Sequence, residues 1–173
     1  MSEPPKIIRV VPYDRMWPRM FVAEKELLLG VFEEEGQMLE HIGSTSVPGL
    51  GAKPVIDIMA GVRSLANVER MIPRIEGLGY AYVPEYEAEI PGRRYFRKPR
   101  VRPRTHHLHV VELGTEFWES HLAFRDFLRE RPEWAEEYYL LKRELAGRLR
   151  GDGRAYTEAK SDFVERVLGE VRA

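Results

Sequence analysis

A segment rich in glycine and hydroxyl residues separates two strand-like apolar segments, and it constrains this chain more than any other feature. It reads His41-Ile-Gly-Ser-Thr-Ser-Val-Pro-Gly-Leu50, and strands are expected over residues 38–42 and 55–62. Glycines let backbone N–H groups approach a ligand, and hydroxyls add donors, as in loops that hold phosphate. We therefore predict a phosphate-binding loop between two strands. The alternative is an ordinary polar turn.

The candidate ligand-binding residues of this region are Gly43, Ser44, Thr45, Ser46 and Lys53. A Walker-type loop would need a glycine, a lysine and a serine or threonine in direct succession, followed by a helix. Here Gly51 and Lys53 are separated by an alanine, and Pro54 follows the lysine. The segment therefore does not predict P-loop kinase chemistry.

Asp57 interrupts the apolar run Val55-Ile56-Asp57-Ile58-Met59. A carboxylate in a buried strand costs free energy unless it is paired or coordinated, so we predict a catalytic or metal-binding role for it. Met59 shares its strand face, where a second carboxylate would complete a paired metal site. A structural aspartate that accepts backbone N–H bonds is the alternative.

Two histidines, His107 and His109, lie at strand spacing on one face of the segment 106–112. We predict that they bind a divalent metal ion together with Asp57, and that Asp57 and His109 are catalytic. Imidazole favours zinc or manganese and carboxylate oxygen suits magnesium, so the mixed donor set leaves Mg, Mn and Zn open. The alternative is a pair of histidines on a solvated sheet face.

Seven of the twelve residues from Arg93 to Arg104 are basic. This density creates a strong local positive potential, so we predict that at least one of Arg93, Arg94 and Arg97 contacts an anionic ligand. A solvated hairpin balanced by upstream acids is the alternative. Lys160 flanks the apolar face of a predicted helix, where it either contacts phosphate or lies along the surface. The net charge of −1 argues against extended nucleic-acid binding.

The order of predicted elements indicates an α+β fold. Strands cluster between residues 38 and 112, with one helix before them, over 18–35, and helices after them, over 115–130, 133–150 and 156–171. Ser64 predicts the start of one more helix among the strands, which closes at Gly77. This order favours a mixed or antiparallel sheet covered by helices, with a helical C-terminal region. A length of 173 residues fits a single domain, which we place at 1–173.

Two further observations bear on the compartment. The longest apolar run is far too short to span a bilayer, and the first residues do not read as a secretory signal, so we expect no membrane association. The chain contains no cysteine, which excludes disulfides and thiolate chemistry and is compatible with a reducing compartment. We therefore expect a cytoplasmic protein.

Several long motifs in their order along the chain resemble the GrpB family, whose members look like distant relatives of the nucleotidyltransferase fold. They cover nearly the whole sequence: Tyr13-Asp-Arg-Met-Trp-Pro18, His41-Ile-Gly-Ser-Thr-Ser-Val-Pro-Gly49, Lys53-Pro-Val-Ile-Asp57, Gly92-Arg-Arg-Tyr-Phe-Arg97, Thr105-His-His-Leu-His-Val110, His121-Leu-Ala-Phe-Arg-Asp126 and Glu158-Ala-Lys160.

The resemblance implies a mixed sheet in which Gly43 and Ser44 occupy the superfamily's phosphate-holding Gly-Ser signature and Asp57 its first metal-binding acid. Met59 stands where the superfamily normally has a second metal-binding acid. On the neighbouring strand, His107 and His109 stand where the superfamily has a further acid. We thus expect a nucleotidyltransferase-like protein that binds a nucleotide or phosphorylated small molecule, with an acceptor that the sequence does not name.

Two alternatives stay open. The first is a non-catalytic module that binds nucleotides or ligands related to coenzyme A, because some family members are fused to dephospho-coenzyme A kinase. The second is a phosphoester hydrolase whose metal is held by histidine and aspartate.

Overall fold

A five-stranded mixed sheet forms the centre of the computed structural model, which describes residues 2–36 and 38–173. The strands are β1 (Met38–Ile42), β2 (Ile56–Val62), β3 (Ala81–Tyr82), β4 (Arg93–Lys98) and β5 (His106–Glu112). They lie in the order β1-β2-β5-β4-β3. Only β2 and β5 pair in parallel, and the other neighbours are antiparallel. This arrangement confirms the predicted α+β class with a mixed sheet.

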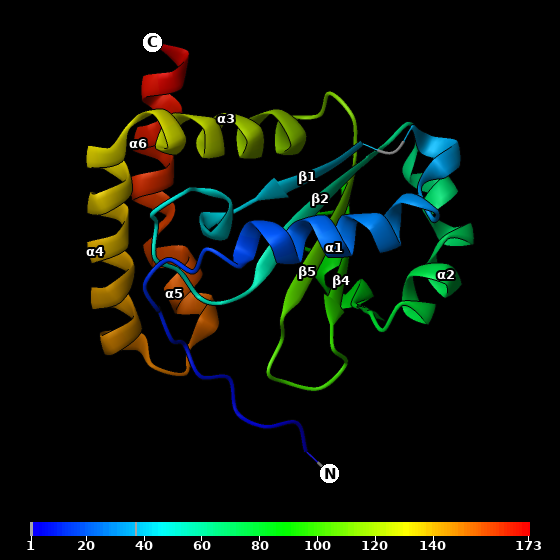
Figure 1. The fold of residues 1–173 in the computed structure, drawn as a ribbon, viewed down its shortest axis with the longest axis horizontal. Helices are drawn as coiled ribbons and strands as arrows, with labels where there is room; N and C mark the ends of the chain where they lie inside the picture. The colour runs from blue at the N-terminus through cyan, green and yellow to red at the C-terminus, as the bar shows by residue number, and fades with distance from the viewer. Residues whose placement is uncertain (1, 37) are drawn as a thin grey trace.

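Helices cover the sheet and form the C-terminal region. They are α1 (Trp17–Leu29), α2 (Ile72–Gly77), α3 (Glu116–Glu130), α4 (Pro132–Leu149), α5 (Gly153–Ala159) and α6 (Ser161–Arg172). In Figure 1, α1 crosses the front of the sheet, α3 runs along the top, and α4, α5 and α6 gather at the left, away from α2. Within the described residues, no helix has both the length and the apolar character needed to cross a membrane.

Three predicted helices differ from those observed. The first ends at Leu29 rather than near Glu35, because the chain turns into a short 3-10 helix, Glu33–Glu35, and then a left-handed Gly36. The predicted helix after Ser64 is split into the 3-10 helix Leu65–Arg70 and α2. Pro73 at the start of α2 lacks the N–H that would continue the hydrogen-bond series.

The predicted helix over 156–171 is two helices, α5 and α6, which meet at Lys160. They bury their apolar residues in different places. Tyr156 of α5 packs with Ile8 and Leu145, whereas Phe163 of α6 packs with Leu128 and Tyr138. The turn at Lys160 allows both helices to bury their apolar sides.

The two faces of the sheet have different roles. One face carries the main core, to which β2 and β5 contribute Ile56, Ile58, Ala60, Val62, Leu108 and Val110, with Trp17 and Leu28 of α1 packed on them. On the other face, α3 covers one end through Trp118, which packs on Met59 and Val111. Asp57 and its polar neighbours occupy the rest of that second face.

Candidate functional site

The carboxylate of Asp57 contacts both predicted histidines. Its Oδ1 lies 3.2 Å from Nε2 of His109 and 3.4 Å from Nδ1 of His107. The parallel register places Asp57 directly beside His107, which explains why the three side chains share one sheet face. The Asp57 side chain keeps 29% of its surface exposed, so solvent and ligands reach it.

Two residues of β4 complete this polar face. Nη1 of Arg93 lies 3.5 Å from Nδ1 of His109, and the ring of Tyr95 contacts the rings of His107 and His109 at 5.5 and 5.3 Å between centroids. Because a guanidinium only donates, Nδ1 of His109 must accept. The proton of the neutral ring is then on Nε2, where it is donated to Asp57.

These contacts shift two pKa values below their ordinary range. Burial raises the pKa of Asp57, but hydrogen bonds from His107 and His109 and their electrostatic attraction together outweigh it, so the carboxyl stays ionised. Burial lowers the pKa of His109 more than Asp57 raises it. At neutral pH, Asp57 is therefore an ionised carboxylate that accepts a hydrogen bond from the neutral imidazole of His109.

The donor arrangement does not fit the predicted metal site as it stands. A ligating imidazole needs a free nitrogen lone pair, whereas Nε2 of His109 carries a proton toward Asp57. Consistent with this, the described residues 2–36 and 38–173 include no group of three or more histidine, aspartate or glutamate side chains arranged to hold an ion. Metal binding by Asp57, His107 and His109 stays a prediction.

Gly43 brings the loop against the carboxylate. Its φ is +72°, and a Cβ added there would lie 2.7 Å from Oδ2 of Asp57, so only glycine allows this approach. The predicted hydroxyl donors are used inside the protein instead. Ser44 hydrogen-bonds to Tyr138, Thr45 to His41 and Val55, and Ser46 to the Gly43 carbonyl.

The helices hold this loop in place. Nε of Arg129 donates to the Ser46 carbonyl at 2.9 Å, and Arg125 bonds to the His41 carbonyl and to Glu40. Val47 and Leu50 pack into the apolar cluster formed by α3, α4 and α6. Burial lowers the pKa of His41 to about 4, so its ring is neutral when Nε2 bonds to Thr45 at 2.9 Å.

Four lysines interact electrostatically with one another, and we call them the lysine group: Lys6, Lys53, Lys142 and Lys160. The ammonium groups of Lys53 and Lys160 lie 4.9 and 4.6 Å from the centre of the Tyr156 ring. Both lysines interact electrostatically with Asp57, and Lys6 interacts with Lys53. Across the described part of the chain, none of the four forms an ion pair with an acidic side chain.

Burial lowers the pKa of each of these lysines, and repulsion by other lysines lowers the pKa of Lys6, Lys142 and Lys160 further. Burial, and then repulsion by Lys53, lowers the pKa of Lys160 to about 7. Burial and repulsion by Lys160 and Lys53 lower the pKa of Lys142 to about 6. Lys142 is only 2% exposed and donates to the Gly51 carbonyl at 2.6 Å. Burying these amines therefore costs stability, and at neutral pH the lysine group carries less than its full positive charge.

The structure divides the predicted arginines. Arg93 lies on the Asp57 face, whereas Arg94, one residue later, points to the opposite face and interacts with Glu69 and Glu87. Arg97 is paired directly with His107 and shares the Asp57 face. The Nε atoms of Arg93 and Arg97 are buried and lack a hydrogen-bond partner within the described residues. Farther along the hairpin, Arg102 and Arg104 pair with Glu3.

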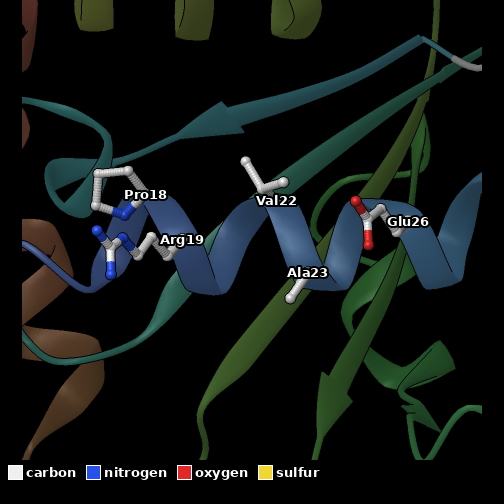
Figure 2. A pocket seen from close by; sticks show the side chains of 5 residues that line it. All are labelled: Pro18, Arg19, Val22, Ala23 and Glu26. Carbon is white, nitrogen blue, oxygen red and sulfur yellow. The ribbon is translucent and has the colours of Figure 1, made fainter.

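Met59 and the surface pocket of Figure 2 lie outside this site. Met59 is fully buried and packs with Trp118. The strand position where a second carboxylate would complete a paired metal site therefore holds a core side chain. The pocket in Figure 2 lies on α1 and is lined by Pro18, Arg19, Val22, Ala23 and Glu26, none of which contacts Asp57.

Comparison with known proteins places the chain in a family. The model described as GrpB protein matches residues 7–170. The chain belongs to the GrpB family. It is 36% identical over 166 residues to the glutamate-rich protein GrpB of Alkalihalophilus pseudofirmus, covering 94% of each protein. A crystal structure of the conserved protein GrpB from Enterococcus faecalis superposes with a TM-score of 0.86 and 36% identity, over 94% of this chain and 96% of that one.

Other relatives are longer than this chain. The chain is 39% identical over 162 residues to the UPF0157 protein YqkA of Bacillus subtilis, but this match spans 94% of the chain and only 46% of YqkA. A dephospho-CoA kinase of Mycolicibacterium paratuberculosis is 26% identical over 184 residues, a match that covers 90% of the chain and 44% of the kinase. The GrpB unit thus occurs within larger proteins.

Sequence reasoning missed two members of the lysine group. Lys142 follows Tyr138 by four residues and precedes Leu145 by three, which places it on the buried face of α4. This spacing could have predicted a buried lysine from the sequence. For Lys6 the sequence carries no such signal. Its place depends on Ile8, which is buried and hydrogen-bonds to the Arg150 carbonyl beside α5.

Proposed function

We propose that this GrpB-family protein binds a nucleotide or another phosphorylated metabolite between the lysine group and the Asp57 face. The lysine group is the observation that carries the proposal. Lys53, Lys142 and Lys160 are buried or half-buried amines, and none of them forms an ion pair with an acidic side chain among the described residues. Burying an unpaired charge costs several kcal/mol per ion, a cost that folds tolerate chiefly at functional sites.

A phosphate group has the chemistry that this group of side chains lacks. It supplies negative charge and several acceptor oxygens, and ammonium and guanidinium groups bind it through charge-assisted hydrogen bonds. The unpartnered Nε atoms of Arg93 and Arg97 and the buried Tyr156 hydroxyl add donors around the same region. A phosphorylated ligand would therefore satisfy cations and orphaned donors together.

Nucleotide-related ligands are favoured by two comparisons of different strength. The dephospho-CoA kinase of Mycolicibacterium paratuberculosis contains a segment similar to this chain. The resemblance of the Gly43-Ser44 loop and Asp57 to the nucleotidyltransferase signature points to the same ligand class. Because His109 is proton donor to Asp57, we assign binding that does not depend on a metal ion.

Isothermal titration calorimetry with and without chelator tests this proposal. The panel is ATP, ADP, AMP, dephospho-coenzyme A and coenzyme A, each titrated up to about 1 mM. We expect at least one to bind with or without chelator, and Lys53→Met to weaken that binding by roughly tenfold or more. Lys25→Met, on α1, is the matched control and should bind as the unchanged protein does. Absence of binding across the whole panel would refute the proposal.

A second candidate function, nucleotidyl transfer, rests on the contact between Asp57 and the two histidines. An ionised carboxylate with a lowered pKa is a weak base, but it accepts hydrogen bonds and can orient an attacking hydroxyl group. Incubation with α-labelled triphosphates, divalent metals and a pool of acceptors tests this candidate. Label transfer that Asp57→Asn abolishes supports it, whereas equal labelling by both proteins argues that Asp57 takes no part.

A further inference from the structure

We infer that the ligand of this site carries a chain of two or more linked phosphates, which the lysine group and the arginines of β4 bind at separate points. This inference rests on the proposed function and specifies the class of ligand. The cations come from three separate parts of the chain. Lys6 belongs to the N-terminal segment, Lys53 to the loop before β2, and Arg97 to β4.

Electrostatic interactions connect these cations into one belt. Lys6 interacts with both Lys53 and Arg97, and Lys53 and Lys160 interact with Asp57. Arg97 is paired across the sheet with His107, which lies 3.4 Å from Asp57. Nη1 of Arg93 lies 3.5 Å from Nδ1 of His109, the other imidazole on Asp57. A single phosphate contacts only the nearest few donors, so a longer anion is needed to reach both ends.

Charge balance favours the same class. The site contains four basic side chains, Lys6, Lys53, Arg93 and Arg97, and the acidic group on this sheet face is Asp57. Two more lysines, Lys160 and Lys142, add positive charge when they are protonated. Asp152 interacts with Lys6, and Glu89 interacts with Arg93. With Lys142 and Lys160 neutral, the four cations exceed the three acids by one charge. A bound anion favours protonation of both lysines, which raises the excess to three, and a diphosphate or triphosphate matches that charge better than one phosphate dianion.

The N-terminal segment makes Lys6 a built part of the belt. The Lys6 side chain packs against Gly153, where an added Cβ would lie within 3 Å of three of its atoms. The neighbouring Ile8 is buried and bonds through its N–H to the Arg150 carbonyl at 3.0 Å. Glycine at 153 therefore leaves room for the Lys6 side chain.

Calorimetry of the full chain with inorganic phosphate, pyrophosphate and tripolyphosphate tests the inference. We expect one site per chain and an affinity that rises at least about tenfold from phosphate to tripolyphosphate. Lys6→Met and Arg97→Met should each weaken tripolyphosphate binding by roughly tenfold and phosphate binding much less. The matched control, Arg154→Gln, removes an exposed charge of α5 that pairs with Glu158 and should leave both affinities unchanged.

Three results would overturn the inference. They are equal affinity for the three probes, more than one tripolyphosphate per chain, and an equal loss in Arg154→Gln. Thermal unfolding of each variant shows whether it is folded, and Lys6→Arg should restore binding if the charge is what matters. If ATP or coenzyme A binds but the three inorganic probes do not differ, the proposed function survives without the polyphosphate inference. If nothing binds, both fail.

Discussion

Replacing Lys142 by methionine should stabilise the protein and weaken its affinity for anions. Lys142 is 2% exposed, and its pKa falls from 10.5 to about 6, because burial and two neighbouring lysines disfavour its charge. At neutral pH the folded state must therefore deprotonate an amine that is charged in the unfolded chain. Each pKa unit is about 1.4 kcal/mol, so the cost near pH 7 is on the order of 5 kcal/mol.

Methionine removes that cost but also the hydrogen bond to the Gly51 carbonyl, worth about 1–3 kcal/mol when the acceptor stays buried. The expected net gain is about 2–4 kcal/mol near neutral pH. Between pH 6 and 10.5 the unfolded chain binds a proton that the folded protein does not, so the stability of the unchanged protein rises with pH in this window. The advantage of the variant must shrink as pH rises.

Urea unfolding of both proteins, at about pH 6.5 and about pH 8.5, measures this difference. The advantage of Lys142→Met should fall by about 2–3 kcal/mol between the two conditions. Lys25→Met, on α1, serves as the control. A variant that is less stable at both pH values, or an advantage that does not change with pH, would refute the reasoning that an unpaired buried lysine is retained for ligand binding.

Three further substitutions test two contacts that build the site and one ion pair elsewhere in the fold. Gly43→Ala should weaken ligand binding in calorimetry, because its Cβ would displace Asp57. The control is Gly49→Ala, which has a φ of +82° and open space and should cost only about 1–2 kcal/mol of stability. Equal ligand binding by the two variants would contradict the close approach of Gly43 to Asp57. Arg129→Ala should lower the free energy of unfolding in urea by about 1–2 kcal/mol, because it removes the hydrogen bond to the Ser46 carbonyl. The control Arg148→Ala should lower it by less than about 0.5 kcal/mol, and equal losses would argue against an anchoring role for Arg129. Glu24→Gln should lower the free energy of unfolding by roughly 2–3 kcal/mol, since the buried carboxylate pairs with Lys98 and accepts a hydrogen bond from Tyr80. Glu76 pairs with Arg100 at the surface, so Glu76→Gln should be nearly neutral.

Alternating strands are where the sequence was most informative about the fold. β1 and β5 have the predicted bounds, because apolar and polar residues alternate there with the period of a half-buried strand. Helix ends were less predictable. Tertiary burial decides whether the residues after Leu29, or on either side of Lys160, continue one helix or turn, and local spacing does not contain that information.

For the site, strand spacing correctly placed His107 and His109 on the face of Asp57. The same rule, applied to β4, would have separated Arg94 from Arg93 and Arg97, which lie four residues apart and therefore share a face. Hydrogen-bond direction was beyond the sequence, since the role of His109 depends on the position of Arg93. Sequence reasoning proposed Lys53 and Lys160 as ligand residues, but it could not join the lysine group, whose members come from the N-terminal segment, a loop, α4 and the turn between α5 and α6.

A crystal structure of the protein soaked with ATP, once with chelator and once with manganese, tests the central claim most directly. The account predicts phosphate oxygens within hydrogen-bond distance, about 3 Å, of the Lys53 and Lys160 ammonium groups in both crystals. Phosphates bound elsewhere on the surface, or seen beside Asp57 only with manganese, would contradict it.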